Sequence, residues 1–311
     1  MNKISKFFLT VGLVSTLAAC GNEGSSSSAS ANTENKGWPE EITLVQMPNE
    51  NNPQAASLHT QLREHLSEEL GIEVNELEGG SYAVGIEAMA SGNLDVMLAS
   101  PMSYYQAKDR AGAELLVSPQ TSSEKHNYYT AFITQGDNEK INSMEDLKGT
   151  NFAFVNAASS SGYLYPKGTL VQEFDLDPDL VEQSDYFFEN VTFSESHPNS
   201  LMGVAMGDFE AAAVAASVID SMIEAGNIKE GDIKEVGRTA DIPDASYIVR
   251  GDLPDDFKES LKEAFISFEN EEYFEAIHED PKTRFVAVEQ DYYDPAIEML
   301  DAINALEEVQ E

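Results

Sequence analysis

The sequence predicts an α/β protein made of two lobes, and three observations support this fold class. Short apolar runs alternate with longer segments in which apolar residues recur at helical spacing. Such alternation is typical of mostly parallel sheets that helices cover on both faces. Roughly 275 residues follow a polar N-terminal stretch, which exceeds the usual size of one α/β unit. Breaks near Gly136 and Ile242 divide the pattern.

The first alternation ends at residue 134. The pattern predicts strands at residues 42–47, 72–77, 95–99, 114–117 and 128–134, and helices at residues 54–70, 82–91 and 104–110. In the first helix, Leu58, Leu62 and Leu66 recur every four residues, so we expect them to share one buried face.

The second alternation follows the break at residues 136–137. It predicts strands at residues 151–155, 190–194 and 211–216, with helices around residues 144–147 and at 162–174, 199–206 and 218–224. Residues 236–239 and 247–250 indicate return strands. Residues 255–268 indicate a helix with a Phe/Leu stripe, and short helices that include residues 294–306 end the chain.

The N-terminus has the pattern of a secretory signal. Lys3 and Lys6 precede an apolar run at residues 7–17, which is too short to span a bilayer. Leu17-Ala18-Ala19-Cys20 resembles a bacterial lipobox, which implies that residues 1–19 are removed and that Cys20 carries fatty acyl chains such as palmitate. The alternative is a plain signal peptide with an incidental cysteine. Residues 20–37 lack apolar periodicity, so the lipidated cysteine would be followed by a flexible tether.

The charge balance restricts the possible partners. With 18 basic and 56 acidic residues, the formal net charge is −38. Binding to a phosphate backbone needs a basic face, so we exclude nucleic acid as a partner. The acidic residues are spread along the chain and indicate a solvated surface, as would suit a salt-rich or alkaline habitat. Cys20 is the single cysteine, so there is no disulfide framework or thiolate metal site, and no pair of histidines has metal-binding spacing.

Three consecutive hydroxyls form the most informative motif. Ser159, Ser160 and Ser161 follow the apolar residues 151–155 and precede a predicted helix. The first turn of a helix presents N–H groups without intrahelical partners and a partial positive charge, and serine hydroxyls add further donors. This combination can bind a tetrahedral oxyanion without Lys or Arg. The alternative is an ordinary serine N-cap.

The residues around this motif resemble one protein family. Asp146-Leu147-Lys148-Gly149, Phe152-Ala153-Phe154-Val155 and residues 159–164 with Pro166 are similar to the central signature of the phosphate-, phosphite- and phosphonate-binding proteins of ABC importers. The resemblance extends from about residue 42 to about residue 297. Further matching positions are Tyr82, Glu87-Ala88-Met89, residues 95–101, Tyr128, His197 and Ile242-Pro243.

The resemblance implies a type II periplasmic-binding-protein fold, in which two α/β lobes joined by a two-strand hinge enclose a ligand cleft. Lobe 1 would consist of residues 38–135 plus 245–311, and lobe 2 of residues 136–244. It also implies a monomeric receptor without catalysis, metal or cofactor. Such a receptor sits on the extracytoplasmic face of the cell membrane and delivers a small phosphorus oxyanion to the permease and ATPase subunits of an ABC importer.

The same resemblance supplies the candidate ligand-binding residues. The three serines would bind the anionic oxygens through hydroxyls and amides, with Tyr82 and Tyr128 reaching the ligand from the first lobe and the hinge. His197 would donate one ring N–H to an oxygen. For each tyrosine the alternative is a packed aromatic, and for His197 it is a structural histidine.

Departures from the family pattern restrict the ligand. Positions where family members that bind aminoalkyl phosphonates commonly have acidic or amide side chains fall on Ala215 and Ser217. The family's usual Asp falls on Ala245, although Asp244 is adjacent and its role stays open. Because an ammonium group without a carboxylate partner is costly in a closed cleft, we expect a non-amino ligand: phosphite, phosphate or a small alkyl phosphonate.

Two other functions compete with transport. An extracellular phosphoester hydrolase would need an activated nucleophile or clustered metal ligands; Gly-x-Ser-x-Gly is absent, and Ser161 has only His197 as a distant base. The same fold can also serve as a ligand sensor for a membrane kinase or as a receptor for another organic anion.

Overall fold

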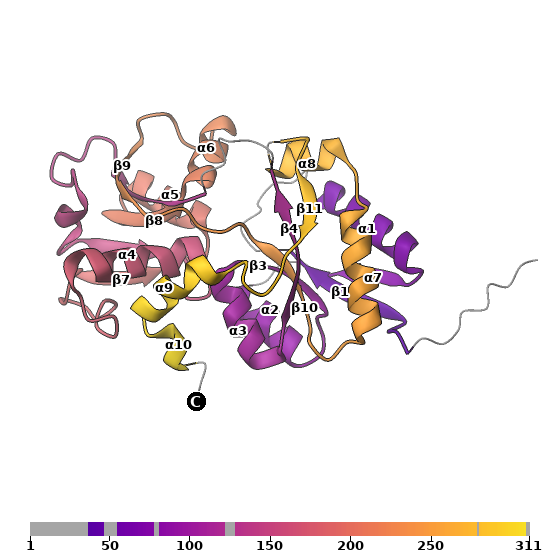
Figure 1. Ribbon diagram of the computed structural model, residues 1–311. Helices are drawn as coiled ribbons and strands as arrows, with labels where there is room; N and C mark the ends of the chain where they lie inside the picture. Colours follow the sequence, from indigo (N-terminus) through magenta and orange to yellow (C-terminus); the bar gives the residue numbers. More distant parts are fainter. Residues whose placement is uncertain (1–36, 47–54, 78–80, 122–127, 279, 309–311) are drawn as a thin grey trace, which may run out of the picture. The chain divides into compact units, whose positions relative to one another are not determined.

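The computed structural model describes residues 37–46, 55–77, 81–121, 128–278 and 280–308 (Figure 1). The expected signal peptide, Cys20 and most of the tether lie outside the described residues, so their interpretation stays a prediction. Within the described ranges, no helix combines the length and the apolar character that crossing a membrane requires.

The first sheet contains six strands in the order β11-β4-β10-β3-β1-β2. Their bounds are β1 Glu41–Val45, β2 Glu73–Glu76, β3 Val96–Ala99, β4 Glu114–Gln120, β10 Ser246–Val249 and β11 Arg284–Ala287. The strands β1, β2 and β3 run parallel, whereas β10 is antiparallel to both of its neighbours. The associated helices are α1 Ala55–Leu70, α2 Tyr82–Ala90, α3 Pro101–Ala111, α7 Asp255–Ile266 and α8 Glu271–His278.

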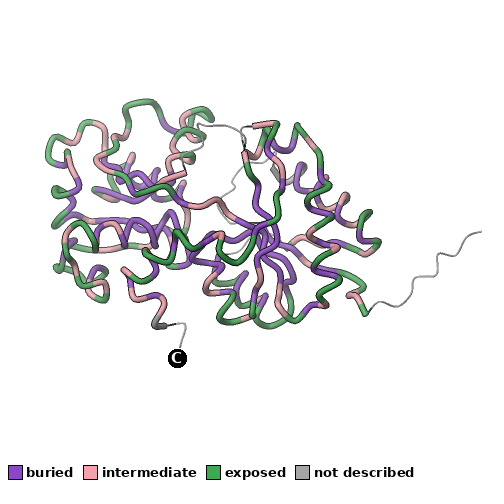
Figure 2. The backbone as a smooth tube through the Cα atoms, in the orientation of Figure 1, coloured by how far each residue is buried: buried purple, intermediate pink, exposed green. Residues whose placement is uncertain are grey.

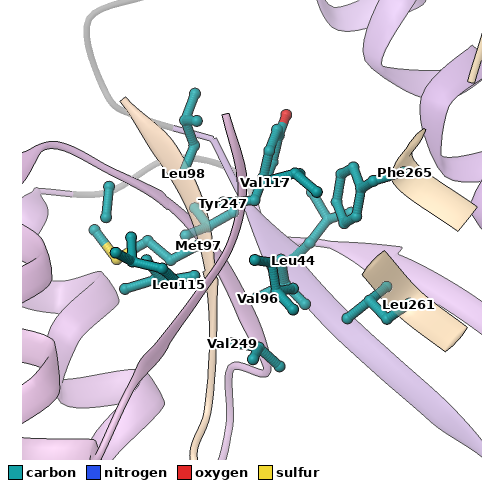
Figure 3. Packing of buried hydrophobic residues seen from close by; sticks show 14 of the residues in the cluster. Leu44, Val96, Met97, Leu98, Leu115, Val117, Tyr247, Val249, Leu261 and Phe265 are labelled. Atoms are coloured by element: carbon teal, nitrogen blue, oxygen red, sulfur yellow. The ribbon is translucent and has the colours of Figure 1, made fainter. Parts of the chain in front are cut away.

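The apolar spacing of α1 explains its packing. Leu62 and Leu66 are fully buried and Leu58 nearly so, which confirms the face expected from the sequence. Helices α1 and α7 pack side by side against this sheet (Figure 1). The leucines of α1 belong to a hydrophobic cluster that also contains Tyr247 and Phe265, and Figure 3 shows part of it. The ring centroids of Tyr247 and Phe265 lie 4.5 Å apart.

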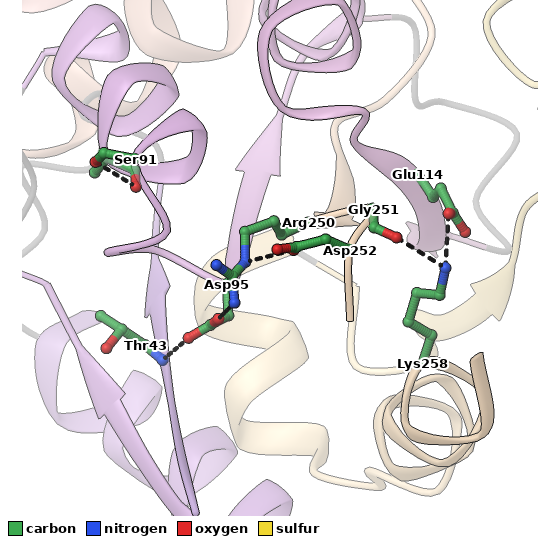
Figure 4. Close-up of polar contacts among 9 residues, drawn as sticks. Thr43, Ser91, Asp95, Glu114, Arg250, Gly251, Asp252 and Lys258 are labelled. Carbon is green, nitrogen blue, oxygen red and sulfur yellow. Dashed lines mark hydrogen bonds and ion pairs between the residues drawn. The ribbon is translucent and has the colours of Figure 1, made fainter. Parts of the chain in front are cut away.

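Polar contacts fix one end of β3 (Figure 4). Asp95 accepts a 2.8 Å hydrogen bond from the Thr43 N–H and forms a 3.0 Å ion pair with Arg250, which follows β10. Burial raises the pKa of Asp95, while the Thr43 N–H and the Arg250 guanidinium oppose that rise. The contacts tie β1, β3 and β10 together at the edge opposite the start of α3.

The second sheet has five strands in the order β7-β6-β8-β5-β9. Their bounds are β5 Thr130–Gln135, β6 Asn151–Phe154, β7 Asn190–Phe193, β8 Ala211–Ala215 and β9 Ile233–Arg238. The helical segments with it are η1 Met144–Leu147, η2 Ser160–Leu164, α4 Tyr165–Phe174, α5 His197–Met206, α6 Ala216–Glu224, α9 Asp294–Ala302 and α10 Ala305–Glu308.

Both faces of the second sheet are covered. Two hydrophobic clusters lie on opposite faces of β8. Ala211 and Ala213 pack in the cluster that contains side chains of α4, whereas Ala212 and Val214 pack in the cluster that contains side chains of α5. This alternation follows from the two-residue period of a strand. The central strand β8 is therefore buried along its whole length, while the edge strands β7 and β9 are partly exposed (Figure 2).

The chain passes between the sheets at places that differ in part from the expected boundaries. Strand β5 belongs to the second sheet, so the first passage lies within residues 121–129, before the break near Gly136. The second passage lies between β9 and β10 and includes Ile242. The chain leaves the first sheet for the second time after β11.

The C-terminal helices also differ from the expected grouping of residues 245–311 with the first lobe. Ala296 and Leu300 of α9 pack in the same cluster as Leu170 of α4, beside the second sheet. The expected grouping is therefore wrong for α9, because sequence spacing reveals an apolar face but not the surface that covers it.

We predict that Leu300→Ala destabilises the protein by about 2–5 kcal/mol, since it removes a side chain that is 1% exposed. The matched control is Ile297→Ala on the same helix, where the side chain is 38% exposed and the loss should stay below about 1 kcal/mol. Urea unfolding measures both. Equal, small losses would contradict the packing of α9.

Candidate functional site

The serine motif forms a helical turn at the carboxyl end of β6. Residues 160–164 form one π-type turn, in which the Tyr165 N–H donates to the Ser160 carbonyl, and α4 continues from it. The helix thus begins two residues before the predicted 162–174. Ser159 is the N-cap, and its Oγ accepts the Gly162 N–H at 3.0 Å. A Cβ on Gly162 would lie 2.3 Å from Val155 Cβ, so only glycine lets this turn pack so closely on the chain after β6.

The middle serine contacts the first sheet's helix α3. Ser160 Oγ donates to Ser100 Oγ at 2.9 Å and accepts the Met102 N–H at 2.8 Å. The Ser160 N–H donates to the same Ser100 hydroxyl at 3.3 Å. Two helix starts, those of η2 and α3, therefore meet at Ser160. Sequence analysis missed Ser100; its only signal was a serine before Pro101, the pattern of a helix N-cap.

The third serine is the centre of a network of neutral groups. Its Oγ accepts the Tyr128 hydroxyl at 2.8 Å and lies 2.9 Å from His197 Nε2. Its carbonyl accepts the Thr130 hydroxyl at 2.6 Å. The structure therefore brings together Ser161, Tyr128 and His197, three of the residues expected to bind ligand.

The tautomer of His197 follows from its other nitrogen. Nδ1 lies 3.0 Å from the Ala215 N–H, which can only donate, so Nδ1 must be the unprotonated acceptor. The ring then carries its hydrogen on Nε2 and donates it to Ser161 Oγ. Burial lowers the pKa of the fully buried His197 to about 4, so the ring is neutral at pH 7. At Ala215, where acidic or amide side chains are expected in relatives that bind ammonium groups, the chain thus supplies a backbone donor to His197.

These contacts fix the direction of the Ser161 hydroxyl hydrogen. Because Ser161 Oγ accepts from both Tyr128 and His197, its own hydrogen has to point toward a third group, and the hydroxyl acts as a donor. Burial raises the pKa of Tyr128 to about 12, and the nearby Asp244 carboxylate adds to that rise. Tyr128 therefore stays protonated, and it keeps donating to Ser161 at any physiological pH.

The other predicted residues are placed as follows. Ser159, Ser160 and Ser161 are all buried in one turn, with Ser159 making the N-cap bond that the alternative interpretation expects. Tyr82 begins α2 and is buried in the core cluster of the first sheet, as a packed aromatic would be. The part that these residues play in ligand binding stays a prediction.

We predict that His197 makes stability depend on pH. Its folded pKa of about 4 is below the unfolded value of about 6.5, so between these values the unfolded chain binds more protons. Its contribution is complete above pH about 6.5 and is lost as the pH falls to about 4, by about 3 kcal/mol in total.

The measurement is urea unfolding of the wild type and of His197→Gln from pH 7 to pH 4. The wild type should lose more stability than the variant across this interval. Parallel curves would contradict a buried neutral imidazole.

Comparison with known proteins identifies the family of this chain. Residues 44–293 match the profile of the family described as "ABC transporter, phosphonate, periplasmic substrate-binding protein". The phosphate-import protein PhnD of Mycolicibacterium smegmatis is 26% identical over 281 residues, which cover 84% of this chain and 84% of that protein.

Two solved structures share the fold. A binding-protein component of an ABC phosphonate transporter from Pseudomonas aeruginosa superposes with a TM-score of 0.71 at 21% identity, covering 86% of this chain and 94% of that one. PhnD1 from Prochlorococcus marinus, in complex with methylphosphonate, gives 0.70 at 19% identity, covering 85% and 98%. The type II periplasmic-binding-protein fold expected from the sequence is thereby confirmed. The chain belongs to the periplasmic phosphonate-binding family of ABC transporters, and it is a substrate-binding protein rather than an enzyme.

Proposed function

We propose that this chain is a lipid-anchored extracytoplasmic receptor that binds phosphite, phosphate or a small alkyl phosphonate and delivers it to an ABC importer. The observation that carries the proposal is the Ser161 hydroxyl, which is buried and held as a donor by Tyr128 and His197. An oriented donor at the start of a helix suits the oxygens of a tetrahedral anion.

Neutral donors fit the charge of this molecule. A net charge of −38 disfavours an anion at long range, so binding has to rely on short hydrogen bonds in a site that excludes water. The Ser161 hydroxyl provides such a bond without a charged side chain, whereas the Ser160 and Gly162 N–H groups of η2 already donate to Ser100 Oγ and Ser159 Oγ. Because the direction of the Ser161 hydroxyl is fixed before the ligand arrives, little conformational freedom is lost on binding.

The names of similar proteins support this class of ligand. The relatives include a phosphate-import protein and a probable phosphite-binding protein, and one structural neighbour was solved with methylphosphonate. These anions share at least two oxygens on a tetrahedral phosphorus, which is the feature that a hydroxyl and amide site recognises.

The site favours ligands without an ammonium group. Position 215 is a buried alanine whose N–H is bound to His197, and alanine also occupies position 245. Asp244 lies close enough to Tyr128 to affect its pKa, so it is the candidate carboxylate partner for an ammonium group. We propose that Asp244 does not replace the missing carboxylates and that 2-aminoethylphosphonate binds more weakly than methylphosphonate.

The contact between η2 and α3 suggests how the ligand is retained. Ser160 bonds to Ser100 and to the Met102 N–H, so it links the helix starts that belong to the two sheets. A receptor of this fold encloses its ligand when the lobes close, and bonds present only in the closed form favour closure. The importer would then recognise the closed surface, while a lipid on Cys20 would keep the receptor at the membrane.

Calorimetry with phosphite, phosphate, methylphosphonate and 2-aminoethylphosphonate tests the proposal. We predict that Ser161→Ala weakens binding of the preferred anion at least about tenfold, because a hydrogen bond to a charged acceptor is lost. Ser221→Ala is the matched control, since its hydroxyl bonds to the Ser217 carbonyl on exposed α6, and its affinity should equal that of the wild type.

Unchanged affinity in Ser161→Ala would show that the anion does not bind at the Ser161 hydroxyl. Tight binding of 2-aminoethylphosphonate with none of the other three would overturn the choice of ligand.

A further inference from the structure

Tyr165 has a buried hydroxyl that the network around Ser161 does not use. The residue is 2% exposed, and its hydroxyl has no hydrogen-bond partner among the described residues. A hydroxyl buried without a partner costs free energy relative to a satisfied one. Phenylalanine would fill the same space without that cost. The presence of a hydroxyl at this position therefore indicates a hydrogen-bond partner that is not among the described residues of the chain.

The position of Tyr165 relates it to the serine turn. It is the first residue of α4, directly after η2, and it follows Ser161 by four residues. Residues at this spacing lie on one face of a helix, so Tyr165 shares the face that presents Ser161 to Tyr128.

The surroundings of Tyr165 agree with this placement. It packs in the cluster that contains Met102 from the start of α3, and Tyr128 packs against the same cluster. Burial raises the pKa of Tyr165 well above its ordinary value, and the nearby Tyr128 adds to this rise. The phenol is therefore a permanent neutral donor beside the group that orients Ser161.

We infer that the Tyr165 hydroxyl is a further hydrogen-bond donor to the bound phosphorus oxyanion, an inference that rests on the proposed function. It takes an oxygen that Ser161 does not bind, so two oxygens of the ligand are held from one helical face. Ser161 and Tyr165 thus form a pair that suits an anion with at least two oxygens on one tetrahedral centre.

The test compares Tyr165→Phe with Tyr163→Phe, a neighbouring tyrosine whose hydroxyl accepts from Lys167 Nζ at 2.8 Å and donates to Glu182. Thermal unfolding without ligand and calorimetry with phosphite, phosphate and methylphosphonate are measured for both variants and for the wild type. Tyr165→Phe should keep or raise the melting temperature and weaken the preferred anion about ten- to hundredfold. Tyr163→Phe should lower the melting temperature and leave affinity within about twofold of the wild type.

The outcomes separate the two proposals. If the wild type binds an anion and Tyr165→Phe binds it equally well, the inference about Tyr165 is overturned while the proposed function stands. A lower melting temperature in Tyr165→Phe would also overturn it, because the hydroxyl would then have a structural partner. If the wild type binds none of the three anions, both proposals fail together.

Discussion

The site depends on one hydroxyl oxygen that accepts two hydrogen bonds. Ser161 Oγ receives the Tyr128 hydroxyl and the His197 Nε2–H, so its own hydrogen can only be donated. On a molecule with a net charge of −38, such an oriented neutral donor attracts an anion at short range without adding a fixed cation. In our inference, the same principle extends to the hydroxyl of Tyr165. Each is a dipole whose direction the fold determines before a ligand arrives.

The second sheet brings these groups to one edge. The strands β6 and β8 run parallel and end there, while β5 is antiparallel and begins there, with Thr130 opposite Ala215. As a result, η2 after β6, the Ala215 N–H at the end of β8 and Tyr128 before β5 meet at the same place. His197 is the first residue of α5, the helix that follows β7, and its Nδ1 accepts the Ala215 N–H, which fixes its tautomer. A change in the register between β5 and β8 would therefore misalign Ser161 even if every side chain were kept.

Much of this arrangement could be predicted from the sequence, because the strands and helices carry local signals. The apolar run after residue 41 gave β1, and the spacing of Leu58, Leu62 and Leu66 gave the buried face of α1. The serine motif identified the turn, although not its π geometry or the close packing of Gly162 against Val155. Contacts between distant segments could not be read in the same way. Ser100 meets Ser160 across 60 residues, and α9 packs beside α4 rather than with the first sheet. Neither contact leaves a periodic pattern, since each depends on how separately formed elements dock.

The central claim, that neutral donors hold the anion, is tested most directly by the salt dependence of affinity. Calorimetric titration with the preferred phosphorus anion is repeated between about 0.1 M and about 1 M sodium chloride, over which the Debye length falls from about 10 Å to about 3 Å. Our account predicts that affinity stays constant or increases, because salt screens the repulsion from the acidic surface and leaves the short hydrogen bonds intact. A steep loss of affinity with added salt would show that a fixed positive charge holds the ligand, and it would contradict the account.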